Sequence, residues 1–168
     1  MQKLIIFRPL GFILLSSLFL VLSLFSTPTN AQLQFNITDG QVAPTPIAIA
    51  NFTNENGEIS DVGRQIAQII SGDLESSGLF RPVDTAAFIA PPAAPSVRPN
   101  FTNWTPLGVK GLLVGSAQLS EGGKTLVEFV LWDVVTGEPI ASAEGEADRN
   151  GIRRIAHQIA DFVSELEG

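Results

Sequence analysis

Hydrophobic and polar residues alternate along several parts of the chain with the period of a β-strand. Leu33, Phe35 and Ile37 are separated by polar residues, which predicts a half-buried strand. The apolar run Ile47–Phe52 is typical of a strand that is covered on both faces. Three further strands, separated by glycine-containing turns, are predicted over residues 112–119, 125–132 and 140–147.

Two other segments place apolar residues at helical spacing. The first begins at a capping residue, Ser60 or Asp61, and is expected to end at the glycine stop Gly78. The second begins near Asn150 and carries its apolar residues on one face, which needs a sheet to cover. These apolar positions are Val62, Ile66, Ile69, Ile70 and Leu74 in the first helix, and Ile152, Ile155, Ala156, Ile159, Phe162, Val163 and Leu166 in the second.

The segment between the first helix and the last three strands has a different composition. Leu79–Val83 is interpreted as a short extended piece, and the proline-rich run Ala90–Pro99 is typical of a surface connector. Trp104 follows the connector and is expected to pack onto the sheet. Together the elements predict an α/β (α+β) fold. It has an open mixed five-stranded sheet, in the order β-β-α-β-β-β-α, with two helices packed on the sheet.

The N-terminus has the pattern of a cleavable signal peptide over residues 1–31. Lys3 and Arg8 supply positive charge, and the stretch Leu10–Phe25 is apolar and uncharged. Small and turn-forming residues follow, so cleavage is expected between Ala31 and Gln32. The alternative is a membrane anchor, but the apolar stretch is shorter than the roughly 20 residues that a spanning helix needs. We therefore expect export to the periplasm of a Gram-negative bacterium, with no part embedded in the membrane after cleavage.

Composition narrows the possible partners of the mature chain. Once Lys3 and Arg8 are removed, 8 of the 10 basic residues remain against 17 acidic ones, a balance of −9. A basic patch would be expected on a nucleic-acid-binding protein, so this balance argues against nucleic acid as a partner. The chain has no cysteine, which excludes disulfides and a lipid anchor on an N-terminal cysteine.

The residue types that carry catalysis or bind metals do not form a recognisable motif. His157 is the only histidine, and with Asp161 it would supply two metal ligands without a third. Ser116 lacks the glycine two positions later that a nucleophile elbow requires. Glu144 and Glu146 share one face of an expected edge strand, where acidic residues more often discourage edge-to-edge association than catalyse a reaction. The chain is therefore expected not to be an enzyme and to hold no cofactor or metal.

Residues distributed along the mature chain resemble the N-terminal domain of the TolB family, the periplasmic component of the Tol-Pal system. The most specific piece is the segment Asp73-Leu74-Glu75, then Ser77-Gly78 and Phe80. The resemblance covers about residues 32–168. That piece lies within the matching stretch Ile66–Val83, and the other parts are Pro46–Phe52, Trp104, Gly108, Leu113-Val114-Gly115 and Val127–Val134.

The resemblance implies a non-catalytic interaction domain that supports outer-membrane integrity and cell division. In the family, the first residues of the mature chain contact the C-terminal domain of TolA. A strand with alternating apolar and polar residues at a chain terminus suits this role, because it can add to the edge of a partner's sheet. From the residues alone, the same strand can equally complete the domain's own sheet. The matching residues here are Gln32, Leu33, Gln34, Phe35, Asn36, Ile37, Thr38, Asp39, Gly40, Gln41 and Val42.

One feature of the family is not expected in this chain. Members carry a C-terminal β-propeller that binds the lipoprotein Pal, and the sequence stops at Gly168, where the propeller would begin. The expected organisation is a signal peptide over residues 1–31 and a TolB-like N-terminal α/β domain over residues 32–168, without the propeller. Pal is then a partner only if a propeller is present elsewhere. The alternative function is another periplasmic binding module for envelope assembly with a similar small α/β domain.

Overall fold

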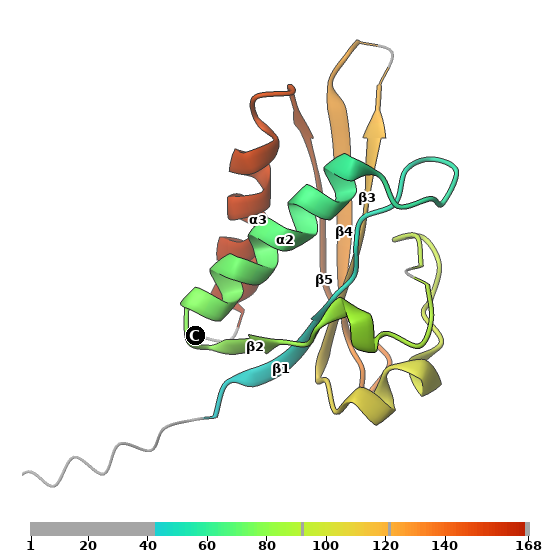
Figure 1. The fold of residues 1–168 in the computed structure, drawn as a ribbon, viewed down its shortest axis with the longest axis vertical. Coiled ribbons are helices and arrows are strands. Elements are labelled where there is room, and N and C mark those ends of the chain that lie inside the picture. Colours follow the sequence, from blue (N-terminus) through green and yellow to red (C-terminus); the bar gives the residue numbers. More distant parts are fainter. Residues whose placement is uncertain (1–42, 92, 121, 167–168) are drawn as a thin grey trace, which may run out of the picture. The chain divides into compact units, whose positions relative to one another are not determined.

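The computed structural model describes residues 43–91, 93–120 and 122–166, which belong to one compact unit, Gln41–Gly168. Its centre is a five-stranded mixed sheet in the order β2-β1-β3-β4-β5 (Figure 1). Strand β1 pairs in parallel with both β2 and β3, whereas β3, β4 and β5 form an antiparallel meander. The strands are β1 (Thr45–Ile49), β2 (Phe80–Pro82), β3 (Gly111–Leu119), β4 (Thr125–Asp133) and β5 (Pro139–Ala147).

Two helices lie on one face of the sheet, α2 (Asp61–Ser76) and α3 (Ile152–Glu165) (Figure 1). The hydroxyl of Ser60 caps α2, because its oxygen accepts a hydrogen bond from the N–H of Gly63 at 2.9 Å. Helix α2 ends where Gly78 adopts a positive φ of 73°, as the glycine stop predicted.

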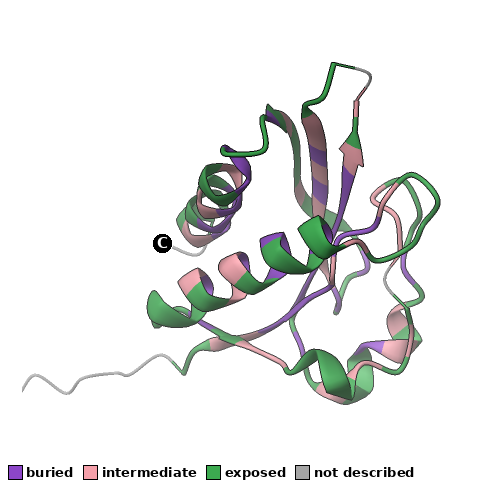
Figure 2. Ribbon diagram, turned by 45° about the horizontal axis from the view of Figure 1, so that its top comes forward, coloured by how far each residue is buried: buried purple, intermediate pink, exposed green. Residues whose placement is uncertain are grey.

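The sheet has a hydrophobic core on each face. On the helix side, residues such as Ile47, Leu113 and Phe129 pack against both helices. On the other side, the segment 83–109 covers Leu112 and Val114 with side chains that include Trp104, which is 3% exposed. Figure 2 shows the buried residues on the inner sides of the helices and along the central strands. The expected packing of Trp104 onto the sheet is therefore confirmed.

The fold class is confirmed as an open mixed five-stranded sheet with two helices, but one of the described strands differs from the expected set. Phe80–Pro82, interpreted from the sequence as an extended piece, is strand β2 at the edge of the sheet. The expected strand Leu33–Ile37 lies outside the described residues. The described strands and α-helices therefore run β-α-β-β-β-β-α. Strand β2 was not predicted as a strand because three residues are too few to show the alternation that identifies strands in a sequence.

The start of α3 also differs from expectation. Asn150 does not cap the helix: the N-cap is Gly151, and no side chain caps the first turn. Instead, the carboxylate of Asp148 accepts a hydrogen bond from the N–H of Gly151 at 2.6 Å and holds the turn that precedes the helix. The side chain that orders this turn is therefore Asp148, two residues before the expected cap Asn150, and the first turn of α3 has no side-chain cap.

Candidate functional site

The site residues expected from the sequence lie outside the described part of the chain. This holds for the cleavage position, Ala31 and Gln32, and for the expected TolA-contacting segment up to Val42. The described residues begin at Ala43, two residues before β1 (Thr45–Ile49), which is an inner strand of the sheet.

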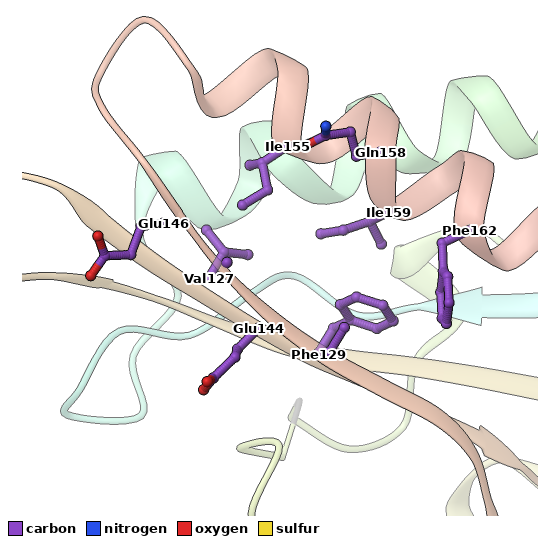
Figure 3. Close-up of a pocket in the computed structure, with 10 residues that line it drawn as sticks. Val127, Phe129, Glu144, Glu146, Ile155, Gln158, Ile159 and Phe162 are labelled. Atoms are coloured by element: carbon purple, nitrogen blue, oxygen red, sulfur yellow. The ribbon is translucent and has the colours of Figure 1, made fainter.

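Among the described residues, an apolar groove separates strand β5 from helix α3. Its cavity volume is about 280 Å³, and Figure 3 shows its lining side chains. Ile155, Ile159 and Phe162 enter it from α3, and Val127 and Phe129 form its floor on β4. The rings of Phe129 and Phe162 meet edge to face, with centroids 5.9 Å apart.

Small residues on β5 explain why the groove is open. On the face toward α3, Ala143 lies opposite Phe129 and Gly145 lies opposite Val127. Neither β5 residue reaches far above the sheet, so the space beside α3 is left unfilled. At Gly145 helix α3 comes close, because a Cβ there would lie 3.0 Å from Cδ1 of Ile155. Strand β5 is the last in the sheet order, so its outer side has no neighbouring strand among the described residues.

The acidic residues of β5 point away from this groove. Figure 3 shows Glu144 and Glu146 directed away from α3, as expected for two residues on one face of an edge strand. Glu146 forms an ion pair with Lys124, with 3.1 Å between its Oε2 and the lysine Nζ. Glu144 lies directly opposite Glu128 on β4. In the described part of the chain, neither Glu144 nor Glu128 forms an ion pair.

His157 links the two helices and is only partly exposed. Its Nδ1 lies 2.5 Å from Oδ2 of Asp73 on α2, and the two side chains are 44% and 35% exposed. The partner comes from another helix, 84 residues away, and is not Asp161 on the same helix. Among the described residues, no group of three or more His, Asp or Glu side chains could hold a metal ion.

A carboxylate fixes the turn that leads into β5. Asp133 accepts hydrogen bonds from the backbone N–H of Val135 at 2.7 Å and of Thr136 at 3.1 Å. The hydrogen bond from Thr136 is the main reason that the pKa of Asp133 lies below its ordinary value. The ionised carboxylate therefore stabilises the folded state above the ordinary aspartate pKa, and this stabilisation is lost as the pH falls through the lowered pKa.

This linkage predicts a pH-dependent effect of the substitution Asp133→Asn. The variant is expected to be less stable than wild type at neutral pH by up to about 1 kcal/mol, since a neutral amide accepts the same hydrogen bonds more weakly and the site is exposed. The difference should shrink toward zero about two units below the ordinary aspartate pKa of about 3.9. Urea unfolding of both proteins across this pH range measures it. A difference that stays constant with pH would contradict the assigned role of the charge.

The sequence contained part of the signal for the groove. Ile155, Ile159 and Phe162 were expected on the apolar face of the last helix, and Val127 and Phe129 on one face of a strand. The sequence pattern treated these residues as core, which holds for Val127, Phe129 and Ile159. It gave no sign that α3 would leave Phe162 37% exposed beside β5. That depends on how the helix sits on the sheet.

Comparisons with known proteins identify the family. The family model described as the TolB amino-terminal domain matches residues 33–140. The chain belongs to the TolB amino-terminal domain family. The Tol-Pal system protein TolB of Rickettsia prowazekii is 36% identical to it over 147 residues, which are 88% of this chain and 33% of the relative. The protein of the same name from Paramagnetospirillum magneticum is 35% identical over 136 residues, 81% of this chain and 30% of the relative.

Solved structures show the same fold as this TolB-family domain. TolB from Acinetobacter baumannii matches with a TM-score of 0.59 and 21% identity, over 73% of this chain and 28% of that one. The C-terminal domain of LpoB from Salmonella enterica matches with a TM-score of 0.50 and 20% identity, over 66% and 87% of the two chains. At these identities the likeness concerns the fold alone. The TolB-family chain spans about a third of the length of the curated relatives it matches.

In the described part of this TolB-family chain, neither helix has the length and apolarity to cross a membrane.

Proposed function

We propose that this chain is a non-catalytic interaction domain of the Tol-Pal system that works in the periplasm and contacts the C-terminal domain of TolA. The observation that supports this proposal is the match of residues 33–140 to the TolB amino-terminal domain, together with relatives named as Tol-Pal system proteins. In that system the domain would support outer-membrane integrity and division. Residues 1–31 would be removed as a signal peptide, which frees the N-terminus at Gln32.

The proposed contact with TolA is made by residues 32–42. Leu33, Phe35 and Ile37 alternate with polar residues, so one face of an extended segment is apolar. Asp39 is the only charged residue in the segment. A contact by this segment would therefore rest on main-chain hydrogen bonds and apolar side chains, which is the mode in which a peptide adds a strand to the edge of a partner's sheet.

The contacts proposed for residues 32–168 do not include Pal. In the family that contact belongs to the propeller, and this chain covers about a third of its relatives.

Three substitutions test the TolA contact without shortening the chain. A mature chain of residues 32–168 with Leu33→Asp, Phe35→Asp and Ile37→Asp is expected to bind the TolA C-terminal domain at least about tenfold more weakly than wild type. The reason is that three apolar side chains would no longer be buried on binding, and each contributes about 1.5 kcal/mol or more when fully buried. Isothermal titration calorimetry measures the affinity.

A matched control carries the same chemical change elsewhere on the surface. Ile89, Leu119 and Val135 are 67%, 74% and 70% exposed, so replacing all three by aspartate should leave both the fold and TolA binding unchanged. Equal weakening by both triple variants would contradict the assignment of the segment. If wild type does not bind TolA at all, the alternative of another envelope-assembly binding module is favoured.

A further inference from the structure

The groove between β5 and α3 has the geometry of a peptide-binding site. The edge of β5, which has no neighbouring strand in the described part of the chain, lies along one side of it, and an apolar helix face forms the other side. In this arrangement an incoming extended segment can form main-chain hydrogen bonds with the strand edge and place every second side chain into the groove. Strand β5 spans nine residues, which is long enough to pair with a complete strand.

On the face of the sheet that α3 covers, an added segment would make apolar contacts. A segment added beside β5 would place the residues opposite Ala143 and Gly145 on this side, because directly opposed residues share a face. There they would contact Phe162, which is 37% exposed, and the apolar side chains of α3. Medium-sized apolar side chains fit this space, because β5 itself contributes only alanine and glycine here.

On the opposite face of the sheet, an added segment would meet carboxylates. There the added segment would place its alternate residues beside Glu144, which directly opposes Glu128 on β4. Like charges opposite each other in a sheet are destabilising, and neither carboxylate has a cation partner among the described residues. A lysine or arginine on the incoming segment would provide that partner.

We propose that this groove binds an extended basic peptide in which apolar residues alternate with lysine or arginine. The apolar residues occupy the groove beside α3, and the basic residues pair with Glu144 and Glu128. The chain's own segment of residues 32–42 does not fit this pattern, because it contains no basic residue. This inference does not depend on the proposed contact with TolA.

The test uses the mature chain and two synthetic nine-residue peptides with blocked ends. One alternates leucine or valine with lysine, and the other has glutamate in place of every lysine. We expect the lysine peptide to bind in low salt and to shift the amide resonances of β5 and of residues 155–162. The glutamate peptide should not bind measurably, because it would place a third carboxylate beside Glu144 and Glu128.

Two variants separate the charged and apolar contacts. Glu144→Lys should weaken the lysine peptide at least about fivefold, since an attraction becomes a repulsion. Ala143→Phe should weaken it at least about tenfold by filling the groove, and Ala143 is exposed, so the fold should be retained. The matched controls are Glu58→Lys and Leu119→Phe, which change exposed residues outside the groove lining and should bind as wild type does.

Several results would overturn the proposal. These are equal binding by Glu144→Lys or Ala143→Phe, equal binding of the glutamate peptide, or resonance shifts outside β5 and α3. A wild-type dimer in sedimentation experiments that Ala143→Phe converts to a monomer would show that a second copy fills the groove. Binding of the lysine peptide only after Leu33→Asp with Phe35→Asp would show that the chain's own N-terminal segment fills the groove of the wild-type chain.

Discussion

Replacing Gly115 with alanine is expected to destabilise the domain by about 3 kcal/mol, at the upper end of the usual cost of overpacking a core. An alanine Cβ at this position would lie 2.1 Å from Cε1 of Phe52 and 2.4 Å from two further ring carbons. The ring cannot turn into solvent, because Phe52 is fully buried in the helix-side core.

The backbone around Gly115 cannot easily move away from the ring either. The N–H of Thr53 donates to the carbonyl of Gly115 at 3.0 Å, and the N–H of Ala117 donates to the carbonyl of Thr53 at 2.8 Å. These hydrogen bonds hold the chain after β1 against β3. Relief of the clash would therefore require both the ring and the strand to shift.

Urea unfolding of the mature chain measures the effect, and Gly72→Ala is its matched control. Gly72 lies on α2 with nothing within 4 Å of its Cβ position, so alanine should stabilise the helix by about 0.5–1 kcal/mol. Phe52→Leu should partly rescue Gly115→Ala, so that the double variant is less destabilised than the sum of the two single ones. Equal stability of Gly115→Ala and Gly72→Ala would contradict the close contact.

Replacing Trp104 with alanine is expected to cost about 4 kcal/mol, within the range for truncating a buried aromatic residue. Trp104 is 3% exposed and belongs to the core that the segment 83–109 forms with β3. Its ring meets Phe88 at 4.9 Å in an edge-to-face contact, so its loss also loosens the start of that segment.

Hydrogen exchange distinguishes local loosening around Trp104 from destabilisation of the whole domain. In Trp104→Ala, the amides of residues 101–109 should exchange faster relative to those of α2 and α3, because the segment has few other buried anchors. Val97→Ala is the control: Val97 lies on the same segment but is 54% exposed, so its effect should stay within about 0.5 kcal/mol. If amide exchange became faster by the same factor throughout the domain, the local role of Trp104 would be contradicted.

The elements with a strong periodic signal were predicted well from the sequence. The three strands of the meander and the last helix are found within a few residues of the expected bounds. Their signals are local, since each long amphipathic segment needs only one covered face to be recognised. Family membership was also visible in the sequence, because the residues that carry it are distributed over strands and turns that any member must form.

The features that the sequence missed depend on residues far apart in the chain. Strand β2 exists because Phe80–Pro82 lies beside β1 after α2 has crossed the sheet, and three residues carry no periodicity of their own. The partner of His157 is Asp73 on the other helix. Neither pairing leaves a pattern in the neighbouring residues.

The sequence by itself determined which residues form the apolar faces of the long elements, and thereby the fold class and the family. Periodicity decides this locally, because burial of one face is a property of each segment. Only the tertiary structure decided that β5 ends the sheet order and that small residues at Ala143 and Gly145 leave a groove beside α3. The reason is that a strand's neighbours, and the space between a helix and a sheet, follow from how whole elements pack and not from any one of them.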